Sequence, residues 1–244
     1  MKPTGREQRL FVEHDLRAGQ LIPCGAAQRN YLVNVLRLGD GDTVLVFNGR
    51  DGEWLAVVRP SGKKVCALEI GRSIREQADG PDIALAFAPL KRGRLDYMVQ
   101  KATELGVSAL HPVFTAFTQA DRINLERMRA NVIEAAEQCG VLRVPTVNEP
   151  QKLERVLENW PSDRVLIFCD EAAAIEDPVA ALGAVSLPAT ILVGPEGGFS
   201  PGERQKLAQM SPAVTLSLGP RIMRADTAAV AALALINATI GDWQ

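Results

Sequence analysis

Residues 82–244 alternate short apolar runs with stretches of helical spacing, which limits the folds that this chain can adopt. Five apolar runs have the length and composition of buried strands: 82–90, 107–115, 164–171, 189–196 and 213–220. Residues 91–106 and 124–140 are predicted to be amphipathic helices, and a further helix follows each of the last two runs. This alternation predicts a parallel sheet with helices on both faces. Ligands of such sheets bind beyond the carboxyl ends of the strands, so site residues are expected there.

Residues 1–75 have a different pattern, which predicts a small β-rich domain. Short β-prone runs, among them the "NYLVNVL" run at 30–36, are separated by turns rich in glycine. Three such turns are "DGD" (40–42), "NGRDG" (48–52) and "PSGKK" (60–64). The polar stretch "RSIREQADGPD" (72–82) is the expected linker. The predicted domains are therefore 1–75 and 81–244.

The composition is that of an ordinary globular protein, with 47% hydrophobic and 23% charged residues. No apolar run approaches the length of a membrane span. The start "MKPTGREQRL" lacks the apolar stretch of a secretory signal, so a cytoplasmic protein without membrane association is expected. Four scattered cysteines, with no C-x-x-C and no paired histidines, argue against a zinc site or a disulfide framework. No metal is predicted.

Charge is distributed unevenly along the chain, although the whole chain has a formal charge of only −2. Residues 1–75 contain 12 Lys or Arg against 8 Asp or Glu, a balance of +4, and the remaining residues have a balance of −6. A basic domain would suit contacts with nucleic-acid phosphates. Charge alone, however, favours a solvated surface.

The stretch "LVGPEGGFSPGE" (192–203) follows an apolar run and contains two adjacent glycines. Ser200 and Glu203 form an S-x-x-E capping box with Pro201 at the first helical position, which predicts a helix start. Gly197 and Gly198 permit positive φ and let a ligand lie against bare backbone. The spacing fits neither a dinucleotide-binding nor a P-loop motif. Taken alone, such a turn is more often only a connection between strand and helix.

A second loop, "LGPRIMRADT" (218–227), precedes a helix that is apolar on all sides. Asp226 or Thr227 is the predicted N-cap of that helix. Such a helix is expected to be buried in the fold or in a subunit interface. Arg221 and Arg224 lie beside its start, where they either pair with nearby carboxylates or take part in function. The residues leave both alternatives open.

These two loops together resemble the RsmE family of the SPOUT superfamily, methyltransferases that act on a uridine of bacterial small-subunit ribosomal RNA. The resemblance extends to "KRGRLDYMVQKATELGVSALHPVFT" (91–115), "EAAEQCGVLRVP" (134–145), "RLFV" (9–12) and "VLRLGDGDTVLVFNGRDGEW" (35–54). It covers nearly the whole chain.

The resemblance implies an α/β fold in which a C-terminal parallel-sheet SPOUT domain contains a trefoil knot and an N-terminal PUA-like β-barrel holds RNA. It also implies a homodimer whose antiparallel subunits complete each site. The expected substrate is uridine ring N3 in 16S ribosomal RNA within the assembled small subunit. Two alternatives remain: a SPOUT enzyme with another RNA target, and a catalytically silent RNA-binding protein, which the intact glycine loop and both arginines disfavour.

The resemblance further implies S-adenosylmethionine as the cofactor and assigns roles to particular residues. The implied catalytic residues are Arg221 and Arg224, which would stabilise charge on the uracil carbonyl oxygens, and Glu196, which would accept a proton. The implied cofactor-binding residues are Phe168, Asp170, Glu171, Val193, Gly194, Pro195, Glu196, Gly197, Gly198, Leu218, Gly219, Arg221, Ile222, Met223 and Thr227.

Four arginines are the candidates for contact with RNA. Arg9, Arg29 and Arg37 lie in the basic part of the chain. Arg143 is added because Val141 stands where relatives often have an arginine, and Arg143 is close enough to substitute.

Overall fold

The computed structural model divides the chain into two compact units, and it describes residues 8–61, 65–120, 122–174 and 177–243. Unit 1 comprises Met1–Ala78 and Ala136–Val144, and unit 2 comprises Asp79–Ala135 and Pro145–Gln244. Unit 1 therefore contains a segment, 136–144, that the sequence analysis placed in the second domain. Residues 1–7, where no secretory signal was expected, lie outside the described residues. So do residues 62–64 of the turn that was predicted at 60–64.

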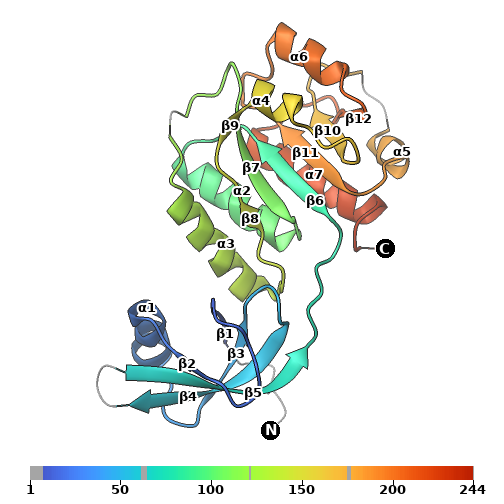
Figure 1. The fold of residues 1–244 in the computed structure, drawn as a ribbon. Helices are drawn as coiled ribbons and strands as arrows, with labels where there is room; N and C mark the ends of the chain where they lie inside the picture. Colours follow the sequence, from blue (N-terminus) through green and yellow to red (C-terminus); the bar gives the residue numbers. More distant parts are fainter. Residues whose placement is uncertain (1–7, 62–64, 121, 175–176, 244) are drawn as a thin grey trace. The chain divides into compact units, whose positions relative to one another are not determined.

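Unit 1 contains a five-stranded sheet (Figure 1). The strands in spatial order are β1 (Arg9–Phe11), β3 (Thr43–Phe47), β4 (Glu53–Ser61), β5 (Val65–Arg75) and β2 (Leu21–Pro23). β1 and β3 are parallel, and the other neighbours are antiparallel. The predicted β-rich character is confirmed. The predicted linker begins too early, because β5 continues to Arg75, which pairs with Glu53 of β4.

The β-prone run at 30–36 is helical, so its interpretation as extended was wrong. Ala26–Arg29 form α1, and Asn30–Val35 continue it as a π-helical turn, η1. Leu32 is fully buried in the core of unit 1. Asn34 Nδ2 donates to Asn30 Oδ1 at 2.8 Å, one turn away. Packing of one side of the turn on the sheet outweighs the β propensity of the run.

Arg9 joins the segment 136–144 to the sheet of unit 1. Its Nε lies 2.6 Å from Glu53 Oε1, with the two side chains 10% and 4% exposed. Its guanidinium also donates to the carbonyl of Ala136, to that of Glu137 at 3.1 Å and to that of Val141 at 2.9 Å. The segment and the sheet are thus held by a buried cation whose donors are satisfied.

Glu53 also binds a second arginine. Arg75 Nε lies 2.9 Å from Glu53 Oε2, and Arg75 Nη2 donates to Gly140 O at 2.9 Å. Burial alone would raise the pKa of Glu53, but hydrogen bonds from Arg75 and Arg9 outweigh it and lower this pKa. Glu53 is therefore ionised inside unit 1 at neutral pH.

Unit 2 contains a parallel sheet, as predicted (Figure 1). Its strands in spatial order are β12 (Ala213–Leu216), β10 (Val165–Cys169), β11 (Ala189–Val193), β6 (Ile83–Phe87), β7 (Ala109–Phe114) and β8 (Thr146–Val147), with β9 (Gln151–Lys152) also on β7. The two-residue strands β8 and β9 were not predicted. The trefoil knot stays a prediction.

Helices cover both faces of this sheet. α2 (Arg92–Glu104), α5 (Pro178–Gly183) and α7 (Ala225–Thr239) pack on one side, with α3 (Leu125–Cys139) joined to α2 by an ion pair between Arg127 and Asp96. α4 (Leu153–Glu158) and α6 (Pro201–Ala208) cover the other side. The helices α4 and α5 were not predicted from the sequence. Among the described residues, no helix is long and apolar enough to span a bilayer.

The core of unit 2 under α4 and α6 consists of side chains that alternate along the strands. Its buried members are Ala86, Val113, Leu153, Leu166, Phe168, Leu192, Phe199 and Leu207. Because side chains alternate in direction along a strand, the intervening residues face α2 and α7.

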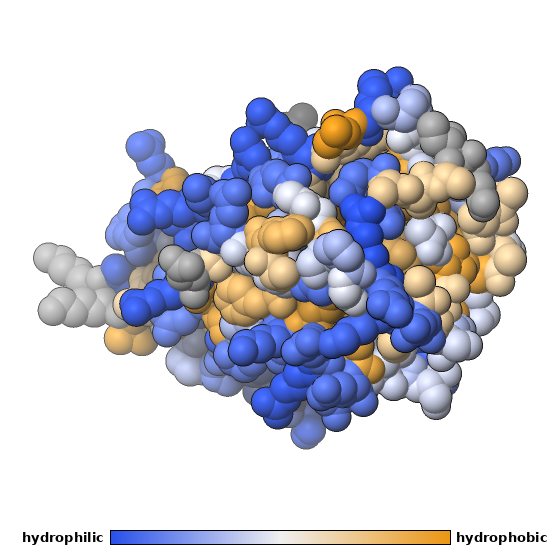
Figure 2. Space-filling model, turned by 90° about the horizontal axis from the view of Figure 1, so that it is seen from above, coloured by the Kyte–Doolittle hydropathy of each residue, from blue (hydrophilic) through white to orange (hydrophobic). Residues whose placement is uncertain are grey.

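On the face shown in Figure 2, hydrophobic residues gather near the middle and are bordered by hydrophilic ones.

Candidate active site

Three neighbouring strands of unit 2 end side by side. In the β10–β11 pair, Cys169 lies opposite Val193, and in the β10–β12 pair Cys169 lies opposite Leu216. The segments that follow these strands therefore start at one edge of the sheet. These segments include both loops that the sequence analysis selected.

The glycine loop is held in place by the start of α6. Ser200 Oγ accepts from Glu203 N at 3.3 Å, and Glu203 Oε2 accepts from Ser200 N at 2.8 Å, so the predicted capping box is confirmed. Glu203 Oε1 also accepts from Ala116 N at 2.8 Å. One glutamate thus fixes the end of the glycine loop and the loop that follows β7.

The two adjacent glycines have different conformations. Only Gly198 has a positive φ, of 66°, so the predicted positive φ at Gly197 was wrong. A Cβ on Gly198 would lie 2.3 Å from Glu171 Oε1, whereas a Cβ on Gly197 would lie 3.3 Å from Phe117 Cβ. Gly194 is also closely packed, because a Cβ there would lie 2.9 Å from the Phe199 ring. A side chain at Gly198 or Gly194 would therefore force a neighbouring side chain to move, whereas one at Gly197 would press only slightly on Phe117.

A cavity lies at the shared strand ends, and most of the predicted cofactor residues line it. These are Asp170, Glu171, Val193, Gly194, Pro195, Glu196, Gly197, Leu218, Gly219, Arg221, Ile222 and Met223. Four further lining residues were not singled out from the sequence: Cys169, Leu216, Ala225 and Ala228. The two loops and the end of β10 therefore surround one space.

Three predicted cofactor residues lie outside this lining. Phe168 is 3% exposed and stacks edge-on with Phe199 in the core, because alternation along β10 turns it away from the neighbouring Cys169. Gly198 lies against Glu171, which does line the cavity. Thr227 is exposed in the first turn of α7.

Two carboxylates at the end of β10 are held by Arg204 of α6. Arg204 Nη2 lies 2.8 Å from Glu171 Oε1 and 3.2 Å from Asp170 Oδ1. Asp170 Oδ1 also accepts from Ala172 N at 3.1 Å. Arg204 was not predicted as a site residue, although its position four residues after the cap Ser200 places it one turn into the helix. This side of the cavity is acidic.

Glu196 has a partner that the sequence analysis did not assign. Arg94 Nη1, from the first turn of α2, lies 3.0 Å from Glu196 Oε1, and both side chains are about 40% exposed. The cationic run at 91–94 was noted only as part of the resemblance. Its position directly after a strand end was the signal that could have identified Arg94.

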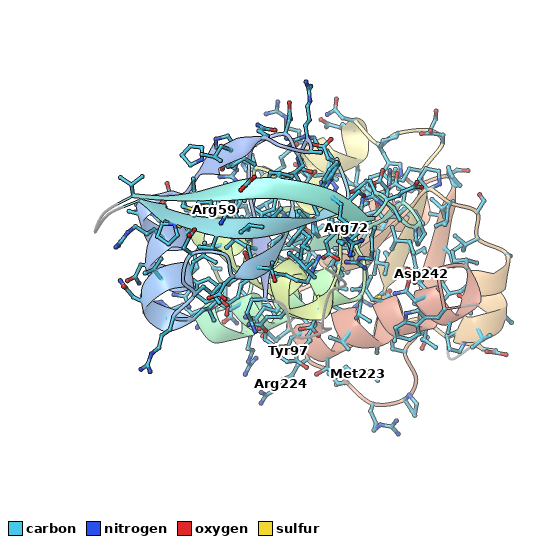
Figure 3. All side chains as sticks on the ribbon, turned by 90° about the horizontal axis from the view of Figure 1, so that it is seen from below. Arg59, Arg72, Tyr97, Met223, Arg224 and Asp242 are labelled. Atoms are coloured by element: carbon cyan, nitrogen blue, oxygen red, sulfur yellow. The ribbon has the colours of Figure 1, made fainter. Side chains whose placement is uncertain are left out.

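The second loop brings its arginines to different places. Arg221 lines the cavity, while Arg224 is exposed, outside the lining, and is the N-cap of α7. The predicted cap at Asp226 or Thr227 was therefore wrong, and α7 begins two residues before Thr227, at Ala225. Figure 3 labels Arg224 in the loop before α7. Within the described part of the chain, neither arginine forms an ion pair with a carboxylate.

The four arginines proposed for RNA contact differ in accessibility. The Arg9 side chain is buried and bonded within unit 1, so contact with RNA would require it to leave these partners, and its assignment stays a prediction. Arg37 is exposed and has an unusual positive φ of 58°. Arg29 and Arg143 are partly exposed. All four belong to unit 1.

Metal and thiol chemistry find little support at this cavity. In the regions that the structure describes, no group of three or more His, Cys, Asp or Glu side chains could hold a metal ion. Burial raises the pKa of the Cys169 thiol to about 12, so this thiol is neutral at ordinary pH. The raised pKa therefore argues against Cys169 as a nucleophile.

Comparison with protein families defines the class of the chain. The RNA methyltransferase domain family matches residues 78–237, and the RNA methyltransferase PUA domain matches residues 25–70. The first match spans the sheet, both loops and the cavity.

Similarity to individual proteins identifies the family within this class of RNA methyltransferases. The ribosomal RNA small subunit methyltransferase E of Rickettsia conorii is 31% identical over 232 residues, which is 94% of each chain. The Synechocystis protein of the same name is 34% identical over 95% of this chain and 78% of its own. The chain belongs to the ribosomal RNA small subunit methyltransferase E family. A Neisseria gonorrhoeae member, solved bound to S-adenosyl methionine, is 27% identical over 98% of this chain and 100% of its own, with a TM-score of 0.86.

Proposed function

We propose that this protein transfers a methyl group from S-adenosylmethionine to ring N3 of a uridine in 16S ribosomal RNA. The observation that carries the proposal is the cavity at the ends of β10, β11 and β12, walled by the two loops. The Neisseria gonorrhoeae relative, whose fold this chain shares over its full length, was solved with this cofactor.

The lining of the cavity fits the chemistry of S-adenosylmethionine. Partly exposed backbone of Gly194 and Gly219 offers amide and carbonyl groups to a flat heterocycle such as adenine, and small side chains of α7 leave room beside it. Asp170 and Glu171 offer acceptors for ribose hydroxyls. The acidic side also suits the positive charge of the sulfonium and amino groups, and Arg221 suits the carboxylate.

The proposed reaction needs few groups from the protein. When bound, S-adenosylmethionine supplies a methyl group that is open to attack by a nucleophile. Glu196 is placed to accept the N3 proton of the uracil, with Arg94 holding its carboxylate in position. Arg221 and Arg94 bring cations to the region where charge develops on the uracil carbonyl oxygens. Arg224 is not part of the cavity lining, so it is a weaker candidate than Arg221 for this catalytic role.

The two units divide the work in this proposal. Unit 1 carries the basic excess and grips RNA, with Arg37 the most accessible of the predicted contacts. Arg29 and Arg143 are partly exposed candidates for the same surface. Unit 2 holds the cofactor and the target base. A substrate within the assembled small subunit places the enzyme in the cytoplasm.

The functional test follows the modified nucleoside. A strain that lacks the gene should lose one N3-methyluridine from 16S ribosomal RNA, measured by mass spectrometry of digested RNA. Purified protein with S-adenosylmethionine and a chelator should restore it on small subunits from that strain. Restoration on another RNA would favour the alternative target, and binding of RNA without any methyl transfer would favour the silent RNA-binding protein.

We also infer a homodimer, because α7 keeps a partly exposed apolar side. Val230, Ala231, Ala234 and Leu235 are only partly buried, and Ile222 before the helix is 88% exposed. A second copy packed antiparallel would cover this surface. Centrifugation should give a mass near twice 26.4 kDa.

Two substitutions test the surface that forms this dimer. Leu235→Glu should shift the protein to monomer because it introduces a charge into the apolar contact. Leu187→Glu, at an exposed leucine outside α7, is the control and should leave the mass unchanged. A fully active wild-type monomer would contradict the inference.

A further inference from the structure

A second cavity of unit 2 adjoins the first. Its lining consists of Pro89, Leu90, Lys91, Arg94, Gln119 and Glu196. Lys91 follows β6 and Gln119 follows β7, and these strands are neighbours in the parallel sheet, so both segments leave the same edge. Glu196 lines both cavities. The two spaces are therefore neighbours across the glycine loop.

An ordered loop presents an aromatic side chain beside Gly197, the residue that follows Glu196. Phe117 is 47% exposed, and its Cβ lies 3.3 Å from the position that a Cβ on Gly197 would take. Thr115 N donates to Thr118 Oγ1 at 2.8 Å, and Thr118 N donates to Thr115 O at 3.2 Å. The capping glutamate of α6 holds the same loop through the Ala116 amide. The exposure of Phe117 is thus set by an ordered turn.

The polar groups of the second cavity are arranged for an uncharged ring with an anionic tail. In the described parts of the chain, the Lys91 ammonium and the Gln119 amide have no ion pair or side-chain hydrogen bond, and both side chains are exposed. Arg94 forms an ion pair with Glu196. An aromatic surface stacks on a base, an amide pairs with a base edge, and cations attract phosphate and carbonyl oxygens.

We propose that this second cavity is the subsite for the target uracil nucleotide, and that Phe117, in the same loop as the lining residue Gln119, is the stacking surface at its border. The base lies against Phe117, Gln119 reads its ring edge, and Lys91 and Arg94 face its carbonyl oxygens and phosphate. A base in this cavity adjoins the donor cavity at Glu196, which is the proximity that methyl transfer requires. The inference rests on the proposed function, and it adds the residues that receive the substrate.

Replacement of Phe117 tests the stacking role. Phe117→Leu should raise the KM for small ribosomal subunits about ten-fold, the size expected for the loss of one stacked base, with kcat reduced less. The affinity for S-adenosylmethionine, measured by calorimetry, should change less than about two-fold. Phe117→Tyr should restore the KM. Tyr97→Leu is the matched control, because Tyr97 is similarly exposed, at 46%, but lies on α2 with its ring near Lys101 of the same helix, and it should behave as wild type.

A direct binding measurement separates this inference from the proposed function. Saturation-transfer NMR with protein loaded with S-adenosylhomocysteine should show contact with uridine monophosphate, weaker contact with cytidine monophosphate, and loss of both in Phe117→Leu. If the wild type methylates RNA and Phe117→Leu keeps the wild-type KM and the contact with uridine monophosphate, the proposed subsite is wrong, while the proposed function stands. Loss of cofactor affinity in Phe117→Leu also overturns the subsite, because Phe117 would then only support Gly197. Absence of methylation by the wild type overturns the proposed function instead.

Discussion

Replacing Gly198 with valine is expected to raise the dissociation constant for S-adenosylmethionine at least about a hundred-fold. Two effects combine. Gly198 has a φ of 66°, a conformation that costs a β-branched residue about 1–3 kcal/mol. The new Cβ would also lie 2.3 Å from Glu171 Oε1, so that carboxylate must leave the Arg204 side chain that holds it. The acidic side of the cavity would then be disordered. Calorimetry on the purified variant measures the change.

A neighbouring glycine supplies the control. Gly202 lies in the first turn of α6, has no positive φ, and no heavy atom lies within 4 Å of the position of an added Cβ. Gly202→Ala should leave the affinity unchanged. An intermediate result is expected for Gly197→Ala, whose Cβ approaches only Phe117. Wild-type affinity in Gly198→Val would show that the glycine loop does not form the cofactor wall.

Replacing Arg9 with methionine is expected to lower the free energy of unfolding of unit 1 by about 3–5 kcal/mol, the range for removing one partner of a buried ion pair. The variant leaves Glu53 with one arginine and removes the donor to three main-chain carbonyls. Arg50→Met is the matched control, because its ion pair with Asp15 is more than half exposed and contributes at most about 1 kcal/mol. Urea denaturation followed by tryptophan fluorescence reports the difference.

The same ion-pair network predicts how stability depends on pH. The arginines hold the pKa of Glu53 below the ordinary glutamate value of 4.5, so its contribution is fully present above about that pH. It is lost as the pH falls through the folded-state pKa. Arg9→Met should therefore show a smaller loss of stability on acidification than wild type. An equal slope for both proteins would contradict the role of Arg9.

Arg37 separates this structural role from RNA binding. It is exposed, so Arg37→Met should leave stability near wild type while making the dependence of RNA affinity on salt shallower by about one unit, the value for one phosphate contact. A change in stability without a change in this slope would assign Arg37 to the fold.

Much of unit 2 could be predicted from the sequence because its signals are local. The apolar run at 189–193, the capping box at Ser200 and the terminal Gly106 each depend on a few adjacent residues, and each is found in the structure. The rule that ligands bind beyond the carboxyl ends of parallel strands gave the region of the cavity, while its individual residues were implied by the family resemblance.

The residues whose place was not predicted have a different feature in common: their place depends on contacts between residues far apart in the chain. The burial of Arg9 depends on carbonyls that come more than 120 residues later, and a count of basic residues gives no sign of it. Arg94 reaches Glu196 across 102 positions, and Arg204 reaches Glu171 across 33. Phe168 was misplaced by one position, because only the register of β10 decides which face a side chain takes.

The segment 136–144 makes the chain return to unit 1 after it has left. Residues 8–78 contain the sheet, but the carbonyls that accept from Arg9 and Arg75 come from residues 136–141. During synthesis on a ribosome, the N-terminal sheet emerges well before those acceptors do. Arg9, Arg75 and Glu53 are then three charged groups without a complete set of partners, and Phe47 lacks the apolar contacts of Ala136 and Leu142. Unit 1 therefore reaches its final stability only when more than half of the protein has been translated.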